Sequence, residues 1–196
     1  MRKFFTYLLL ILILFAPLNA QESETEALKT TMVKISDNFY TILNDENNDE
    51  KMRQKKILKE VTYLFDFRLM SRLSLDKKTR SSITKTQFND FTETFEKYIQ
   101  NYYLDKLDLL KGTSATIKES KKTKNNRIEV TATLQTKTDV KKVIYKFYKN
   151  KKEEWLIYDL EIANVSILQS YRSQFSSYLT EHSFDELLTK LNNNNT

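Results

Sequence analysis

The 196-residue chain contains no cysteine, one histidine, one glycine and one proline. Without cysteine it can form no disulfide and cannot carry a lipoprotein anchor, which needs a cysteine at the cleavage point. A single glycine, Gly112, excludes a glycine-rich phosphate-binding loop. A single histidine, His182, excludes the common zinc sites and His-dependent catalytic triads. We therefore expect neither a metal site nor a cofactor, and a non-enzymatic function.

The N-terminus has the three parts of a secretory signal peptide. Arg2 and Lys3 are basic, residues 4–15 are apolar, and Leu18-Asn19-Ala20 provides small residues for cleavage. The apolar run is shorter than the roughly 18 residues that span a bilayer, although a retained anchor is the alternative interpretation. The sequence thus predicts that residues 1–20 form a signal peptide that is cleaved during export.

The rest of the chain divides into a domain and a short tail. We expect one domain over residues 21–191 and a frayed polar tail over residues 192–196. We also expect a monomer.

The chain is basic, with a formal charge of +6, and Arg2 and Lys3 contribute two of these positive charges. Basic residues concentrate between Lys118 and Lys152. Such a cluster is compatible with nucleic acid, but an exported chain rarely meets nucleic acid, so we expect none as a partner. A solvated sheet face is the simplest interpretation, and attraction to anionic lipid head groups or an acidic partner is the alternative.

The first half of the sequence has helical periodicity. Apolar residues recur every three or four positions from Leu28 to Leu43 and again from Ile57 to Phe65. A longer helix should begin at Thr84, which forms a capping box with Gln87, and should end before Gly112. Two further helices should follow Ser166 and Ser183.

After Gly112 the apolar period changes to two residues. Four alternating segments predict an antiparallel meander with one apolar face; they start near residues 115, 128, 143 and 156. Aligning the apolar residues of the last hairpin pairs Phe147 with Leu156, Tyr145 with Tyr158, and Val143 with Leu160. The fold class is therefore α+β, with helices covering one face of the sheet.

Three blocks of sequence resemble the MlaC (toluene-tolerance auxiliary) family. The first is Phe65-Asp66-Phe67 with Met70-Ser71-Arg72, and the second is the Gln87 to Leu107 helix with its four-residue aromatic and apolar period. The third and most specific runs from Trp155 through Tyr158-Asp159 to Tyr171-Arg172-Ser173-Gln174-Phe175. Asn164 replaces a family glycine in this last block.

The resemblance implies a curved four-stranded sheet wrapped by helices, with an apolar cavity between them. It further implies a soluble periplasmic phospholipid-binding shuttle, which maintains outer-membrane lipid asymmetry. Its partners would be an inner-membrane ABC transporter with an MCE subunit and an outer-membrane lipoprotein–porin complex.

The candidate lipid contacts combine this resemblance with the apolar pattern. They are Phe67, Met70, Phe91, Phe95, Tyr103, Val143, Tyr145, Phe147, Leu156, Tyr158 and Leu160. For each of them, ordinary core packing is the competing interpretation, because filled and hollow cores have the same periodicity. Arg172 could bind a head group, but a structural ion pair with Asp66 or Asp159 is the interpretation we favour.

Two other functions fit the same sequence. A chaperone or assembly factor would use apolar grooves for unfolded outer-membrane proteins. A small-molecule enzyme with an isomerase-like cavity would use Asp66, Asp159 or Tyr158 as acid or base.

Overall fold

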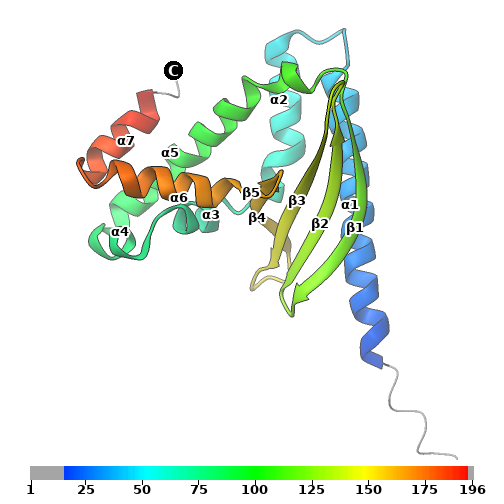
Figure 1. Cartoon of the computed structure of the whole chain (residues 1–196), viewed down its shortest axis with the longest axis horizontal. Helices are drawn as coiled ribbons and strands as arrows, with labels where there is room; N and C mark the ends of the chain where they lie inside the picture. The colour runs from blue at the N-terminus through cyan, green and yellow to red at the C-terminus, as the bar shows by residue number, and fades with distance from the viewer. Residues whose placement is uncertain (1–15, 194–196) are drawn as a thin grey trace, which may run out of the picture.

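A computed structural model describes residues 16–193 as a mainly helical half beside an antiparallel sheet (Figure 1). The basic and apolar parts of the predicted signal peptide lie outside the described residues. Residues 16–20 form the start of the first helix. None of the helices within residues 16–193 is long and apolar enough to cross a membrane.

The helices fall into two groups. Two lie beside the sheet: α1 (Ala16–Leu43) and α2 (Glu50–Val61), the latter followed by the 3-10 turn η1 (Thr62–Leu64). Five form what we call the helical lobe: α3 (Phe67–Ser74), α4 (Lys77–Ser82), α5 (Lys85–Leu104), α6 (Ile167–Tyr178) and α7 (Phe184–Asn193). A second 3-10 turn, η2 (Leu107–Leu110), leads from α5 to the sheet.

Local capping explains where several helices begin. The side chains of Asp66, Asp76, Thr84 and Ser166 each accept a hydrogen bond from a backbone N–H in the first turn of the following helix. These bonds satisfy amides that have no partner within the helix. The capping box predicted for Thr84 is confirmed. Helix α7 continues to Asn193, so the first two residues of the predicted frayed tail, 192 and 193, are helical.

The sheet has five antiparallel strands in sequence order, one more than predicted. They are β1 (Ser114–Lys124), β2 (Arg127–Gln135), β3 (Val140–Lys149), β4 (Trp155–Ile162) and β5 (Val165–Ser166). The extra strand exists because Ala163 and Asn164 adopt φ angles of 50° and 66° and reverse the chain in two residues. Asparagine tolerates this left-handed conformation better than most residues, which explains how it can replace glycine here.

The predicted register of the β3–β4 hairpin is wrong. Phe147 pairs with Ile157, Tyr145 with Leu160, and Val143 with Ile162. A β-bulge contributes to the shift, because β4 carries one extra residue between the partners of Lys146 and Phe147; the pairing is one residue off the prediction at Phe147 and two residues off at Tyr145 and Val143. Strict alternation cannot reveal such an insertion.

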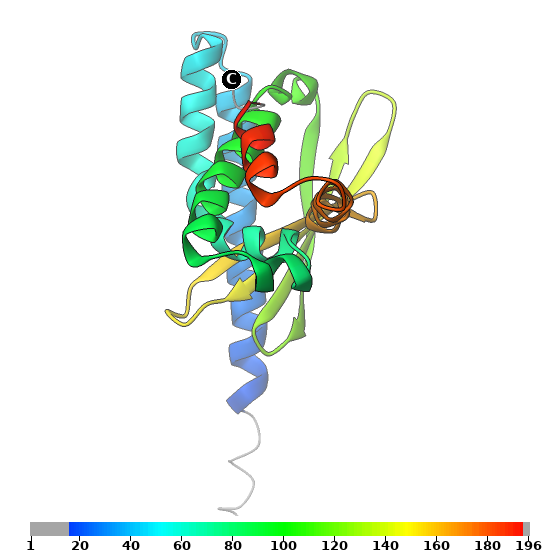
Figure 2. The same ribbon diagram turned by 90° about the vertical axis from the view of Figure 1, so that its left-hand side faces the viewer.

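Three apolar clusters hold the fold together. One lies within the helical lobe, and a second joins α1 to the apolar face of the sheet through Met32, Ile128 and Phe147. The third joins α1, α2 and η2 at Leu43, Ile57 and Leu107, where Figure 2 shows α1 and α2 side by side. Helix α1 therefore covers much of the apolar face, and the lobe lies beyond the β4 edge.

Candidate binding site between the sheet and the helical lobe

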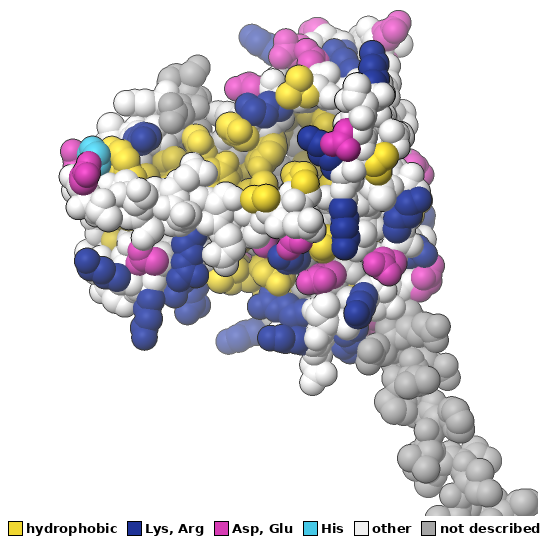
Figure 3. All heavy atoms as spheres, viewed as in Figure 1, with side chains coloured by type: hydrophobic (Ala, Val, Ile, Leu, Met, Phe, Trp, Pro, Cys, Tyr) yellow, Lys and Arg dark blue, Asp and Glu magenta, His cyan; other side chains and the backbone are white. Residues whose placement is uncertain are grey.

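Hydrophobic side chains reach the surface in a hollow between the helical lobe and the sheet (Figure 3). We call this hollow the recess, and four partly buried residues of the two apolar clusters that flank it are the candidates for its lining. Tyr145 and Leu160 are cross-strand neighbours on the sheet side, and Tyr103 lies at the margin of the lobe cluster. Phe65 packs against both the lobe cluster and the sheet cluster, so it marks their junction.

Tyr145 is the most informative residue of the sheet wall. Burial raises its pKa to about 12, and the proximity of Tyr40 adds to the effect. Nevertheless the residue keeps some accessible surface, and no hydrogen bond links its hydroxyl to any residue within 16–193. A ring surrounded by protein but still accessible is typical of a concave wall.

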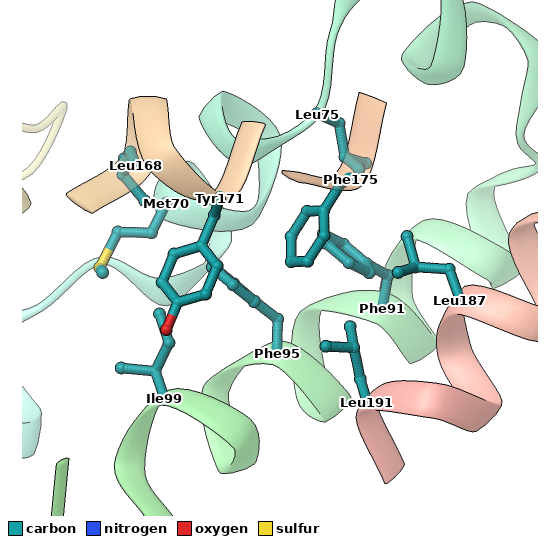
Figure 4. Packing of buried hydrophobic residues seen from close by; sticks show 10 residues of the cluster. All are labelled: Met70, Leu75, Phe91, Phe95, Ile99, Leu168, Tyr171, Phe175, Leu187 and Leu191. Atoms are coloured by element: carbon teal, nitrogen blue, oxygen red, sulfur yellow. The ribbon is translucent and has the colours of Figure 1, made fainter. Parts of the chain in front are cut away.

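The lobe side has a tightly closed core. Phe91 and Phe95 are both 0% exposed, and their rings stack with centroids 5.4 Å apart. Phe175 meets both rings edge-on, and Tyr171 meets Phe95 in the same way (Figure 4). These contacts are the preferred geometry for aromatic pairs. This core leaves no accessible surface on Phe91 or Phe95.

The predicted lipid contacts therefore separate into three groups. Tyr103, Tyr145, Leu160 and Phe67 keep partial exposure. The second group is buried in the clusters and consists of Met70, Phe91, Phe95, Val143 and Phe147. The third group lies on the other face of the sheet, because the bulge aligns Leu156 with Tyr148 and brings Tyr158 against the Tyr148 ring. The prediction that Leu156 and Tyr158 share a face with Phe147 is thus wrong.

Three tyrosines, Tyr98, Tyr103 and Tyr171, pack in the lobe cluster of α5 and α6, and the sequence did not identify all of them as candidate site residues. The rings of Tyr98 and Tyr171 lie 5.9 Å apart in an edge-on arrangement. Burial raises the pKa of Tyr103 to about 12 and also raises that of Tyr171, with the neighbouring tyrosines adding to both shifts. The four-residue period of α5 pointed to Tyr103, whereas Tyr98 appeared only as a widening of that stripe.

A polar contact ties the lobe to the sheet on the face opposite the recess. The Tyr148 hydroxyl donates a hydrogen bond to the Asp66 carboxylate, which also accepts the Leu69 N–H at 2.8 Å. Burial and then this bond raise the pKa of Tyr148 to about 12. The Arg127 guanidinium lies over the rings of both Tyr148 and Tyr158. Asp66 is therefore an N-cap and an anchor between the two halves.

The predicted ion pairs of Arg172 are wrong. Asp159 accepts hydrogen bonds from Ser166 Oγ at 2.8 Å and from the Leu168 N–H at 3.2 Å, and Lys146 Nζ lies 3.4 Å away. Asp159 thus faces Lys146 and the start of α6, and Arg172 lies one helical turn further on.

Arg172 instead lies beside Asp76. Both line a small polar cleft of about 360 Å³ at α6. The pKa of Asp76 is lowered chiefly by a hydrogen bond from the Thr79 N–H, and Arg172 makes a smaller contribution.

The arrangement offers little for acid–base chemistry. Asp66 and Asp159 each serve as a helix-capping acceptor, and neither opens into the recess. Tyr158, the third candidate acid or base, has its pKa raised by burial, so its hydroxyl is harder to deprotonate. Within residues 16–193, no three His, Asp or Glu side chains are grouped so as to hold a metal ion.

Comparison with known proteins decides the family. A model of the MlaC protein family matches residues 33–193, which is most of the chain. The chain belongs to the MlaC family. The resemblance inferred from the three sequence blocks is thereby confirmed.

The fold is shared with a solved structure. It is that of a phospholipid-binding protein from Ralstonia solanacearum in complex with a phospholipid, with a TM-score of 0.72 and 16% identity. The alignment covers 85% of this chain and 96% of the other. No curated protein sequence matches the chain.

Proposed function

We propose that this MlaC-family protein is a phospholipid-binding carrier whose acyl chains lie in the recess between the sheet and the helical lobe. The observation that supports this most is the accessible apolar wall formed by Tyr145 and Leu160, next to a lobe whose own core is closed. The family assignment and the lipid-bound Ralstonia structure of the same fold support the same function.

The energetics set a strict requirement on such a site. Burying acyl chains contributes about 0.8 kcal/mol per CH₂, so two 16-carbon chains represent on the order of 25 kcal/mol. The protein must replace nearly all of this with its own apolar surface. Widening the recess would add surface, provided that the lobe kept its ties to the sheet, which are the Phe65–Ile157 bridge, the Tyr148–Asp66 contact and the bonds of Asp159 to the start of α6. If the recess widened, buried residues such as Met70 and Val143 would become part of its lining.

The family assignment also supports a finer proposal. We propose that the protein is exported to the periplasm, diffuses as a monomer, and carries phospholipid between an outer-membrane lipoprotein–porin complex and an inner-membrane ABC transporter with an MCE subunit. Its contribution would be to maintain outer-membrane lipid asymmetry. Binding and release of lipid need no covalent step, so no enzymatic activity is required.

Native mass spectrometry of the purified protein tests this proposal. We expect a mass increment of one or more phospholipids, which organic extraction removes and incubation with vesicles restores. A matched pair sharpens the test, since Leu160→Glu places a charge in the recess and Thr133→Glu places one on the polar face of β2. The first variant should lose lipid and the second should keep it. A wild-type protein that is empty and cannot accept lipid would contradict the proposal.

A further inference from the structure

A basic cleft of about 780 Å³ includes Tyr148, which lies on the opposite face of the sheet from Tyr145 and Leu160. Residues of α3, α4 and the first turn of α5 line it, together with Tyr148 of β3. Five cations and one carboxylate line it: Arg68, Arg72, Lys77, Arg80, Lys85 and Asp66. The basic segment that the sequence suggested, between Lys118 and Lys152, contributes only Tyr148 to it.

The positive charge of this cleft is not neutralised by the protein. None of the five cations has a carboxylate within 4.0 Å among residues 16–193. The one carboxylate, Asp66, is already engaged by Tyr148 and the Leu69 N–H. Clustered like charges repel one another and weaken the fold. A bound anion would offset this repulsion, so the cleft is a candidate anion-binding site.

Two of the arginines are held in position. The Arg80 guanidinium donates hydrogen bonds to the carbonyl oxygens of Arg72 and Leu75, at 2.9 and 3.1 Å. Arg68 donates to Asn89 Oδ1 at 3.1 Å and lies over the Phe88 ring. Arg72, Lys77 and Lys85 have exposed side chains and are free to meet a ligand.

The mixture of residues points to a particular kind of anion. Guanidinium and ammonium groups bind phosphate oxygens well, and arginine does so with two parallel hydrogen bonds. Leu69, Ile83 and Phe88 place apolar surface among the cations. A phosphate attached to a short carbon backbone matches both features, whereas an inorganic anion would use only the charge.

We propose that this cleft binds a glycerol-phosphate group, presented either by an anionic phospholipid in a bilayer or by a soluble phosphate ester. Binding to a bilayer would place the protein on an anionic membrane surface, where juxtaposed cations each contribute to attachment. The proposal does not depend on lipid being carried in the recess.

Vesicle sedimentation tests the site with a matched pair of triple variants. One variant, Arg72→Gln/Lys77→Gln/Lys85→Gln, removes three exposed charges from the cleft. The control, Lys118→Gln/Lys121→Gln/Lys124→Gln, removes three exposed charges from β1, at the far edge of the sheet. The vesicles are phosphatidylcholine with or without phosphatidylglycerol.

We expect the wild type to bind only the vesicles containing phosphatidylglycerol, and less tightly as salt is raised. The cleft variant should bind at least about tenfold more weakly, and the control less than about threefold more weakly. The cleft variant should unfold at a temperature no lower than the wild type, because it loses only repulsion. Equal losses in both variants would mean attraction by net charge alone and would overturn the proposal.

Titration with glycerol 3-phosphate, followed by amide NMR, separates the two sources. Saturable shifts at residues 68–85 that the cleft variant lacks would support a soluble ester as ligand. If vesicles bind and the ester does not, the bilayer is the source. If neither binds, the proposal is wrong, whatever lipid the native mass spectrum shows in the recess.

Discussion

The core of the helical lobe and the sheet wall of the recess are built from similar residues, but they differ in how completely those residues are buried. In the lobe, Phe91 and Phe95 are wholly enclosed, and each ring meets another aromatic ring. On the sheet, Tyr145 and Leu160 keep accessible surface, and the Tyr145 hydroxyl lacks a hydrogen-bond partner within residues 16–193. An apolar stripe alone does not say whether its face is covered. Coverage depends on which elements meet that face.

The largest expected effect comes from truncating the enclosed core. Phe95→Ala should lower the free energy of unfolding by about 3–5 kcal/mol, because it leaves a cavity among rings that cannot relax. Leu160→Ala, on the partly exposed sheet wall, should lower it by only about 1–2 kcal/mol. Urea denaturation of both variants measures the difference. Equal losses would mean that the sheet wall is as closed as the lobe.

The next effect concerns the joint between β4 and α6. Asp159→Asn should cost about 2–4 kcal/mol, because the buried carboxylate accepts bonds from Ser166 and Leu168 and faces Lys146. Thermal unfolding with Glu161→Gln as control measures it, since Glu161 contacts Lys146 from a more exposed position. A wild-type melting temperature for Asp159→Asn would refute the assigned role.

Alkaline pH provides a third test, this time of the sheet wall. The pKa of Tyr145 is about 12 in the folded protein against an ordinary value of 10.0, so folding favours the protonated hydroxyl. The resulting stability is complete below about pH 10 and is lost as the pH rises toward 12, by about 2 kcal/mol for one tyrosine.

Tyr145→Phe should therefore reduce the loss of stability between pH 10 and 12, as followed by denaturant unfolding. The exposed Tyr63→Phe is the control and should leave the loss unchanged. If both variants behave alike, the Tyr145 hydroxyl is better solvated than the structure indicates.

The smallest effect is expected for Arg172, which the sequence had suggested as a buried ion-pair partner. Because it lies half-exposed beside Asp76 in a polar cleft, Arg172→Ala should cost about 1 kcal/mol or less. Calorimetry of Arg172→Ala and Asp159→Asn compares the losses of stability of the two variants directly. A loss of stability in Arg172→Ala as large as that of Asp159→Asn would contradict this and would favour a structural ion pair of Arg172.

Most of the fold could be predicted because it rests on local signals. The Thr84–Gln87 capping box and the period of α5 defined a helix that the structure confirms. The alternating segments after Gly112 likewise defined the first four strands. The bulge at Tyr158 and the turn at Ala163–Asn164 could not be predicted, since each depends on how the chain meets its neighbours rather than on side-chain pattern.

The candidate site was less predictable for the same reason. Tyr145 and Leu160 were identified, but so were Phe91 and Phe95, which periodicity cannot distinguish from a cavity wall. The basic cleft was missed entirely. Its cations come from α3, α4 and α5, and only the packing of these short segments brings them together.

The central claim is that acyl chains lie in the recess and outside the closed lobe core. Photocrosslinking with a phospholipid that carries a reactive group on its acyl chain, followed by peptide mass spectrometry, tests this directly. We predict labelling of β3 and β4 around Tyr145 and Leu160, with further labelling near Tyr103. Labelling confined to the outer faces of the helices, or absent from β3 and β4, would contradict the account.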